Sequence, residues 1–230
     1  MFWRAAGLSA LAIGSFIAGP AAHATLSWTA TVGGKPTGTM YASFDSLPLG
    51  TTGGSGNGIV VSFALGGEAV QGSAFEWYAP PYLSNDNGAL FGDNTNGPDT
   101  TTYLTTALGT VTLSLPRLEN YVGLLWGSVD ATNTLNLYNG ETLVGTLTGS
   151  QITATPNGDQ GINGTYYVNI DSTEPFDTVV ATSFAGAFEF DNVAFDPADS
   201  PSVPEPRTLA VLGVGLVGLG FARRRRAGDG

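Results

Sequence analysis

The feature that most constrains this chain is a series of short segments in which polar and apolar residues alternate, separated by turns rich in glycine and asparagine. Alternation is strict in residues 110–115 (TVTLSL) and 134–137 (TLNL), and a period of two predicts a β-strand with one face in a core. Asn139 and Gly140 can supply the positive φ angles of a tight turn, so that 142–147 returns as the partner strand of a hairpin. This middle region shows no helical periodicity longer than a turn or two.

Further runs extend the same pattern along the chain. A series of short strands joined by Gly- and Asn-rich turns predicts an all-β fold, an antiparallel β-sandwich of the jelly-roll kind. Two polar segments interrupt it, the low-complexity stretch 50–58 and the long loop 84–102. A loop of that second length is often functional or mobile in a compact domain. The other predicted strands are 26–32, 39–44, 59–65, 75–78, 121–126, 166–170, 178–182 and 188–195.

The last predicted strand is irregular. Its large apolar side chains stand first at even positions, Phe188 and Phe190, and then at odd ones, Val193 and Phe195. Both pairs can face one core only if the strand slips by one residue near Asp191-Asn192. We therefore predict a β-bulge there, and bulges re-aim side chains next to functional sites.

The start of the chain carries the features of a secretory signal peptide. Arg4 supplies a positive charge, 5–18 is an apolar segment, and Ala22-His23-Ala24 fits a cleavage site flanked by small residues. We expect residues 1–24 to be removed and the mature chain to begin at Thr25.

The last thirty residues combine a proline motif, an apolar run and a basic cluster. The motif is stiff and extended, because proline fixes φ and lacks an N–H donor; it consists of Val203, Pro204, Glu205 and Pro206. The apolar run 209–222 is shorter than the ~20 residues that cross a bilayer comfortably, so we expect a weakly anchoring transmembrane helix. The positive-inside rule places the basic cluster on the cytoplasmic side; its members are Arg223, Arg224, Arg225 and Arg226.

In this order, the three parts resemble the PEP-CTERM sorting signal of Gram-negative bacteria. The resemblance implies export, a precursor anchored in the inner membrane, processing near the motif by an exosortase, and delivery to the cell surface or extracellular matrix. Arg207 departs from the family pattern, in which a small or apolar residue is usual, and an ordinary tail anchor is the alternative. We thus expect a signal peptide (1–24), a β-sandwich domain (25–199, galactose-binding-like) and a linker with the sorting tail (200–230).

Composition excludes several classes of site from the mature chain. His23 is the single histidine and the chain has no cysteine, so disulfides, Ser-His-Asp triads, Cys-His dyads and zinc hydrolase sites are ruled out.

Residues 25–199 carry two basic residues, Lys35 and Arg117, against seventeen acidic ones, a net charge of −15. Such a surface repels phosphate backbones, so we expect no nucleic-acid partner. It suits calcium, which takes carboxylate and carbonyl oxygens.

Two sets of acidic residues are candidate ligands for a structural calcium. The closing strand resembles that of galactose-binding-like and carbohydrate-binding jelly rolls, in which an aspartate often holds calcium. This resemblance implies a site of Asp45 and Asp191, since the first and last strands of a sandwich commonly lie side by side. The second set lies in the 84–102 loop and consists of Asp86, Asp93 and Asp99 with Asn94 and Asn96. Such residues also form and cap turns, and that interpretation stays open for both sets.

An aromatic run is the candidate carbohydrate site. Sugar rings pack their C–H faces on Trp and Tyr, while nearby polar groups hold the hydroxyls. The candidates are Trp77, Tyr78 and Tyr82, and two prolines between them would stiffen the platform. The alternative is that Trp77 fills the core and the two tyrosines lie at its edge.

These features predict an exported protein of the cell surface or matrix that is associated with exopolysaccharide or biofilm, is not an enzyme and binds carbohydrate. Its expected partners are the exosortase and secretion machinery, extracellular polysaccharide and, before processing, the membrane. Two alternatives stay open. One is a secreted glycan hydrolase, which needs two carboxylates ~5–9.5 Å apart across a cleft, although no motif positions such a pair and we expect no catalytic residue. The other is a structural surface protein without a specific ligand.

Overall fold

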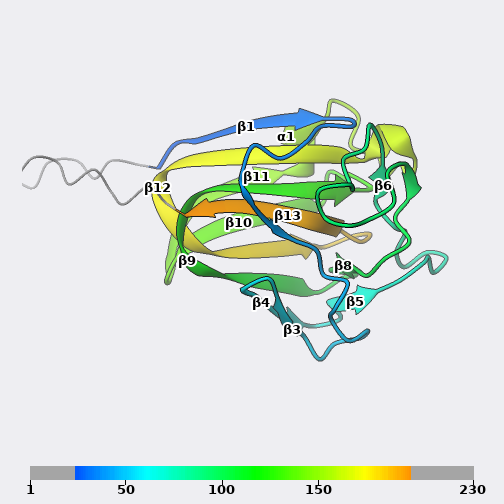
Figure 1. Ribbon diagram of the computed structural model, residues 1–230, viewed down its shortest axis with the longest axis horizontal. Coiled ribbons are helices and arrows are strands. Elements are labelled where there is room, and N and C mark those ends of the chain that lie inside the picture. Colours follow the sequence, from blue (N-terminus) through cyan, green and yellow to red (C-terminus); the bar gives the residue numbers. More distant parts are fainter. Residues whose placement is uncertain (1–23, 198–230) are drawn as a thin grey trace, which may run out of the picture.

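The computed structural model describes residues 24–197, and most of its strands form one eleven-stranded antiparallel sheet (Figure 1). The two longest strands fold this sheet into two layers, which are called the first and second sheet below. Strands β9 (Thr110–Gly127) and β12 (Tyr166–Ser183) pair with each other in both layers. Their pairing is irregular between Asp171 and Phe176, where each strand passes from one sheet to the other. The predicted antiparallel β-sandwich is therefore confirmed, and its ladder is continuous because β9 and β12 belong to both layers.

The bend in the two long strands corrects part of the strand prediction. The segments predicted as separate strands at 110–115 and 121–126 are two halves of β9, and those at 166–170 and 178–182 are two halves of β12. Prolines lie in the bend of each strand, and proline cannot donate to a ladder, so both are placed where the regular pairing stops. These residues are Pro116 and Pro175.

The remaining strands flank this pair in each layer. The first sheet runs β1 (Leu26–Thr31), β12, β9 and β13 (Glu189–Pro197), with β2 (Met40–Ala42) and β8 (Tyr103–Thr105) on β13 and β5 (Glu68–Val70) beside β8. The second sheet runs β11 (Thr142–Thr148), β10 (Asn133–Asn139), β12, β9, β4 (Ile59–Ala64) and β3 (Gly54–Gly56). Outside both lie the hairpin of β6 (Tyr82–Leu83) and β7 (Gly97–Pro98), the helix α1 (Gly149–Ile152) and a 3-10 helix (Ile162–Gly164). The predicted hairpin between β10 and β11 is confirmed, and Gly140 has the expected positive φ, of 56°. Asn139 does not have a positive φ, because it is the last residue of β10 and pairs with Thr142.

The core lies between the two layers and is built from the apolar side of each alternating strand. Trp126 of β9 and Phe188 are fully buried, and their rings stack with centroids 4.2 Å apart. The second sheet contributes side chains such as Leu113 and Val179 to the same cluster. Burying each side chain of this kind contributes roughly 1.5–3 kcal/mol to stability, so this interior is what holds the layers together.

Strand β13 contains the predicted bulge. Its register against β9 shifts between Asp191 and Ala194, and the first of the two residues between them, Asn192, has a positive φ of 54°. Phe190 on one side of the bulge and Phe195 on the other are both buried in the core. Because side chains alternate along a strand, Asp191 and the preceding acid, Glu189, point to the opposite, outer face of the first sheet.

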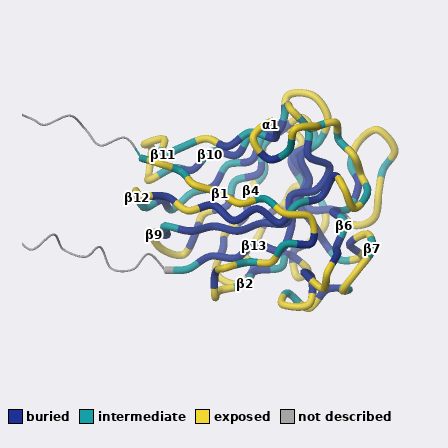
Figure 2. Tube along the Cα trace, turned by 90° about the horizontal axis from the view of Figure 1, so that it is seen from above, coloured by how far each residue is buried: buried dark blue, intermediate teal, exposed yellow. Residues whose placement is uncertain are grey.

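The segment from 71 to 102 covers this outer face. Leu83 is fully buried against Leu125 and Tyr167 of the first sheet, and Phe91 packs on the same small cluster. The backbone N–H of Asp99 donates to Pro81 O at 2.9 Å and closes the base of the 84–102 loop. Figure 2 shows buried residues of the sheets beneath this exposed loop region. The long polar loop is therefore part of the folded body.

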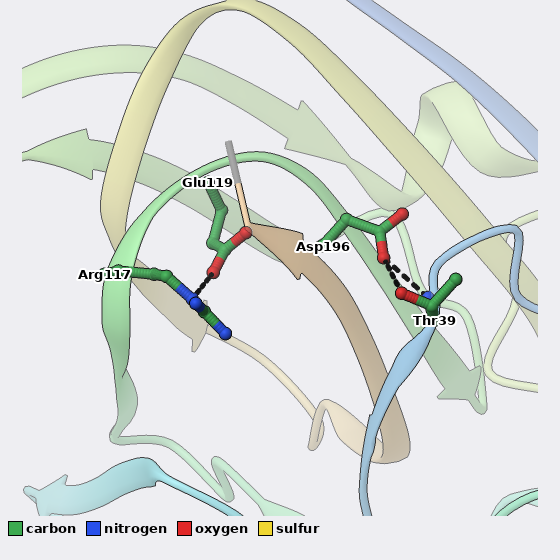
Figure 3. A network of polar contacts seen from close by, with 4 residues as sticks. All are labelled: Thr39, Arg117, Glu119 and Asp196. Atoms are coloured by element: carbon green, nitrogen blue, oxygen red, sulfur yellow. Dashed lines mark hydrogen bonds and ion pairs between the residues drawn. The ribbon is translucent and has the colours of Figure 1, made fainter. Parts of the chain in front are cut away.

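The two ends of the described chain lie at the same end of the sandwich (Figure 2). Leu26 pairs with Ser172 beside the bend of β12, and β13 ends next to Glu119 in the bend of β9. Figure 3 shows how β13 is held there. Asp196 Oδ1 accepts hydrogen bonds from the backbone N and Oγ1 of Thr39, each 2.6 Å long.

Beside this end, Arg117 Nε lies 3.6 Å from Glu119 Oε1, which belongs to a fully buried residue. The predicted signal peptide, the Val203–Pro206 motif and the basic cluster lie outside the described residues. Within residues 24–197, no helix has the length and apolar character needed to span a bilayer.

Candidate functional sites: a buried acidic cluster and an aromatic pocket

Three aspartates converge where the 84–102 loop crosses β13. Asp93 and Asp99 come from the loop, and Asp191 comes from the bulge. One carboxylate oxygen of each lies within 4.8 Å of the others, and the side chains are only 8%, 2% and 0% exposed. Since carboxylates are rarely buried unless they are paired, this arrangement requires a physical explanation.

Some carboxylate oxygens of the cluster accept hydrogen bonds and the others do not. Asp99 Oδ1 accepts hydrogen bonds from the N and Oγ1 of Thr101, at 2.8 and 2.6 Å, and Asp93 Oδ1 accepts from the same Oγ1 at 3.2 Å. Among the described residues, the Oδ2 atoms of Asp93 and Asp99 and both oxygens of Asp191 have no hydrogen-bond partner. Thr101 thus orients two carboxylates and leaves their other oxygens without a hydrogen bond.

Electrostatics make this arrangement unfavourable without a compensating charge. Burial, together with the charges of Asp99 and Asp45, raises the pKa of Asp93 to about 6. Burial also holds the pKa of Asp191 well above its usual range, with Asp99 and Asp93 adding to the effect. Two like charges 4.8 Å apart repel by about 3.5 kcal/mol at an effective dielectric constant of ~20. The three carboxyls therefore cannot all be ionised near neutral pH unless a cation lies between them.

Asn192 adds a fourth polar side chain to this cluster. It is 0% exposed, and neither its Oδ1 nor its Nδ2 has a hydrogen-bond partner among the described residues. Its side-chain amide lowers the pKa of Asp93, so it lies near that carboxyl group although it forms no hydrogen bond of regular length and angle with it. The bulge aims this amide, because it turns the backbone into the left-handed region at Asn192.

The cluster draws on both predicted calcium sets. Asp191 came from the first set, and Asp93 and Asp99 from the second. Asp45 is not in the cluster: it is exposed, and its Oδ2 accepts a hydrogen bond from Ser43 Oγ at 3.0 Å. The first strand, β1, pairs with β12, whereas the last strand, β13, pairs with β2, the strand that precedes Asp45.

The other members of the loop set have local roles. Asp86 is exposed and accepts a hydrogen bond from Asn96 Nδ2 at 3.3 Å. Asn94 Oδ1 accepts from the N and Oγ1 of Thr100, at 3.3 and 3.1 Å. These residues shape the loop in the way that turn-forming side chains do.

An open pocket of about 250 Å³ lies at the other end of the sandwich from the two described termini. Its wall includes the residues that follow β9 and begin β13, whereas the termini lie at the bend of β9. Polar groups dominate the lining beside two aromatic rings. The lining residues are Glu76, Trp77, Tyr78, Ser128, Asp130, Asn157, Gly158, Gln160, Gly186, Ala187 and Glu189.

The aromatic side of the pocket is a tight turn, and here the predicted strand 75–78 is wrong. Ala74 pairs with Tyr78, and Ala74 O accepts hydrogen bonds from the N–H groups of Trp77 and Tyr78 at 3.0 and 3.1 Å. Glu76 at the apex has a φ of 65°, a conformation that is unfavourable for a residue other than glycine. The turn holds Phe75 89% exposed and Trp77 63% exposed, so Trp77 does not fill the core.

The candidate aromatics divide between two places. Trp77 and Tyr78 line the pocket, and Tyr78 packs edge-on against Tyr103 with ring centroids 6.3 Å apart. Tyr82 belongs to β6, where its N–H donates to Thr165 Oγ1 at 3.0 Å, and it is not part of the pocket lining. Phe75, which the sequence analysis did not single out, lines an adjoining hollow of about 390 Å³. The two hollows share Glu76 and Gln160 and form one concave region.

Glu189 is the functional candidate that sequence reasoning missed. It is 2% exposed, its Oε1 accepts a hydrogen bond from Ala79 N at 3.1 Å, and the nearby Ser128 side chain lowers the pKa of its carboxyl group. Burial raises the pKa of Glu189 to about 7. Asp130 lines the same pocket, and its Oδ1 accepts from the N and Oγ1 of Thr132, both at 2.9 Å. The pocket therefore offers carboxyl groups that can donate to or accept from hydroxyls.

Comparison with known proteins identifies the end of the chain. Residues 202–226 match the PEP-CTERM protein-sorting motif, which implies an exported protein with a membrane-anchored precursor. No curated protein matches the chain. Among solved structures, a mutant of a family 29 carbohydrate-binding module matches with 12% sequence identity, 79% coverage of this chain, 99% coverage of its own and a TM-score of 0.29. A similarity of that size is too low to carry a conclusion about this chain.

Proposed function

We propose that this protein is displayed on the cell surface or in the extracellular matrix, where its β-sandwich binds polysaccharide without cleaving it. The PEP-CTERM motif supports the location, because it implies that the protein is exported. The exosortase is the partner expected to process the tail. The pocket beside Trp77 supplies the binding site.

The observation that carries this proposal is the exposed tryptophan at the edge of a polar pocket. Exposing 63% of an indole to water is unfavourable, and a strained turn keeps Trp77 in that position. A sugar ring can cover the indole with its C–H face while its hydroxyls contact Glu189 and Asp130. Phe75 extends the apolar surface into the adjoining hollow, so the site suits a chain of several sugar residues.

The charge of the site selects the class of glycan. Glu76 and Asp130 line the pocket with Glu189, and no basic residue is among its lining residues. An anionic glycan would meet like charges there and elsewhere on this acidic chain. The site therefore favours neutral polysaccharide over uronic-acid or sulfated polysaccharide.

The position of the pocket fits a protein tethered by its C-terminal tail. Strand β13 begins at the pocket, with Glu189, and ends at the opposite side of the sandwich. Its nine residues span roughly 30 Å at 3.3 Å per residue. A tail that continues from the end of β13 would leave the pocket facing away from the attachment point.

Substitution of the exposed tryptophan tests the proposal. The full chain, purified in detergent, is titrated with neutral oligosaccharides in a calorimeter, and Trp77→Ala is compared with the matched control Trp28→Ala on β1. Removing a central aromatic contact costs about 2 kcal/mol, or roughly 30-fold in Kd, so Trp77→Ala is expected to weaken binding by that factor. Trp28→Ala is expected to leave the Kd unchanged. Equal affinities for the wild-type protein and Trp77→Ala would exclude the site.

A glycan hydrolase is the second candidate, and one observation favours it. Glu189 has a pKa near 7 and lies in the same pocket as Asp130, and retaining and inverting hydrolases use an acid of raised pKa with a second carboxylate. Incubation of bound oligosaccharide with the full chain separates the two functions. Unchanged chain length after long incubation supports binding alone, whereas new reducing ends that disappear in Glu189→Gln would establish hydrolysis.

A further inference from the structure

We propose that Asp93, Asp99 and Asp191, together with Asn192, bind one Ca²⁺ ion that fastens the 84–102 loop to β13. This inference is independent of what the aromatic pocket binds. It concerns a different group of residues, on the part of β13 where the bulge interrupts pairing with β9.

The first support is the convergence of the oxygen atoms. One carboxylate oxygen from each of the three aspartates lies within 4.8 Å of the others. Two ligand oxygens on opposite sides of a Ca²⁺ ion are roughly 4.8 Å apart, because each Ca–O distance is about 2.4 Å. Thr101 holds the Oδ1 atoms of Asp93 and Asp99, which leaves their Oδ2 atoms without a hydrogen-bond partner. This division of the oxygens is what a cation site requires.

The second, independent support is Asn192. This amide is completely buried and its approach to Asp93 lowers the pKa of that carboxyl group, yet neither side-chain atom forms a hydrogen bond of regular length and angle among the described residues. A buried amide without partners is rare because it gives up its hydrogen bonds to water. An ion at the centre of the cluster would accept Asn192 Oδ1 as a neutral ligand and remove that penalty for the oxygen.

The chemistry of the donors selects the ion. All four side chains offer oxygen, and the mature chain contains neither histidine nor cysteine, which zinc and copper prefer. Mg²⁺ demands near-ideal octahedral geometry at 2.0–2.1 Å and usually keeps several waters, whereas Ca²⁺ accepts irregular sets of six to eight oxygens. A buried cluster with three carboxylates from two separate segments fits Ca²⁺ better, and the ion would leave a local charge of −1.

The ion would determine whether the loop stays on the sheet. The loop covers Leu125 and Tyr167 with the side chains of Leu83 and Phe91, but without a cation the carboxyl groups at Asp191 can be brought together only if they are not all ionised. With Ca²⁺ bound, the same groups become the attachment. Asp191 is also two residues from Glu189 on β13, so the ion site lies on the same strand as a residue that lines the pocket.

A thermal-shift titration of the full chain in detergent tests the proposal. After dialysis against EDTA, the melting temperature is measured with increasing CaCl₂ and, separately, MgCl₂. At a Ca²⁺ concentration 100 times Kd, the expected rise is roughly 5–10 °C, with a much smaller rise for Mg²⁺ at equal concentration. No rise with Ca²⁺ would overturn the proposal, and an equal rise with Mg²⁺ would overturn the assignment of calcium.

Two variants separate the site from general surface binding. Asp191→Asn replaces one of the three buried carboxyl groups with an amide of similar size, so it is expected to melt at the same or a higher temperature than the wild-type protein in EDTA, but to lose the Ca²⁺ response. Asp86→Asn, an exposed acid of the same loop, is the matched control and is expected to keep the full response. Should Asp191→Asn fail to fold, Asp99→Asn takes its place. A full Ca²⁺ response in either cluster variant would contradict the proposal.

Discussion

Replacing Glu189 with glutamine should make the protein markedly less sensitive to alkaline pH. Burial raises the pKa of Glu189 to about 7 in the folded protein, from an ordinary value of 4.5. Between these two pH values the folded state keeps a proton that the unfolded state has lost. The stabilisation of the folded state is therefore fully present below pH 4.5 and is lost as pH rises through 7. A glutamine cannot ionise, and its Oε1 can still accept the hydrogen bond from Ala79 N.

The size of the effect follows from the shift in pKa. A difference of about 2.5 pKa units corresponds to about 3 kcal/mol, since one unit is 1.36 kcal/mol. This amount can be used with little discount for solvent, because Glu189 is 2% exposed. Relative to the wild-type protein, Glu189→Gln should thus gain about 3 kcal/mol in free energy of unfolding between pH 4.5 and pH 8.

Urea unfolding of both proteins at intervals from pH 4.5 to 8.5 measures this difference. Saturating CaCl₂ in all samples keeps the aspartate cluster from adding its own titration to the curves. Glu141→Gln, the same change at an exposed acid next to the β10–β11 turn, controls for loss of surface charge and should run parallel to wild type. If Glu189→Gln also runs parallel to wild type, Glu189 is not a buried acid of raised pKa, and the account of the pocket's polar groups fails.

Three further predictions concern the core, the aromatic turn and the chain ends. Phe188→Ala should destabilise the protein by about 3–5 kcal/mol in chemical unfolding, because Phe188 is fully buried and stacks on Trp126; a loss under 1 kcal/mol would contradict the packing. Glu76→Gly should raise stability by about 1 kcal/mol, since glycine adopts the φ of 65° without strain, and a loss of stability would mean that Glu76 makes a compensating contact. Mass spectrometry of the protein recovered from its own cells should find Thr25 as the first residue and an end near 203–206. Recovery of the full-length chain would refute processing at both ends.

Alternation of apolar residues predicted most of the sandwich because burial of one strand face is a local property of the sequence. It identified β1, β4 and the β10–β11 hairpin and located the bulge in β13. It failed where strands are only two or three residues long, as in β5, β6 and β7, since such segments show no period. It also divided β9 and β12, because an alternating run on each side of a proline does not reveal whether the bend joins or ends the strand.

The run at 75–78 was mistaken for a strand because its aromatic residues have high β-propensity, which measures fit to a half-buried surface. Their exposure depends instead on the Ala74–Tyr78 turn, a contact that composition does not reveal. For the same reason, the sequence left open whether Trp77 belongs to the core or the surface.

The two candidate sites could be predicted only in part. The acidic residues of the cluster were recognisable as oxygen donors, but Asp93 and Asp99 lie about a hundred positions from Asp191, and only the folded loop places them beside β13. The predicted bulge was the available signal, since it indicated that the strand re-aims a side chain at that point. Glu189 gave no such signal, because a single acid between two phenylalanines has the pattern of a half-exposed strand.

Oxidative footprinting of the full chain, with and without a neutral oligosaccharide, tests the central claim most directly. Hydroxyl radicals label exposed aromatic side chains, so free protein should be modified at Trp77 and at Phe184, which is 81% exposed and is not a lining residue of the pocket. With saturating oligosaccharide, labelling of Trp77 and Phe75 should fall several-fold while labelling of Phe184 stays constant. Unchanged labelling of Trp77 under conditions in which oligosaccharide is demonstrably bound would place the binding site elsewhere and contradict the account.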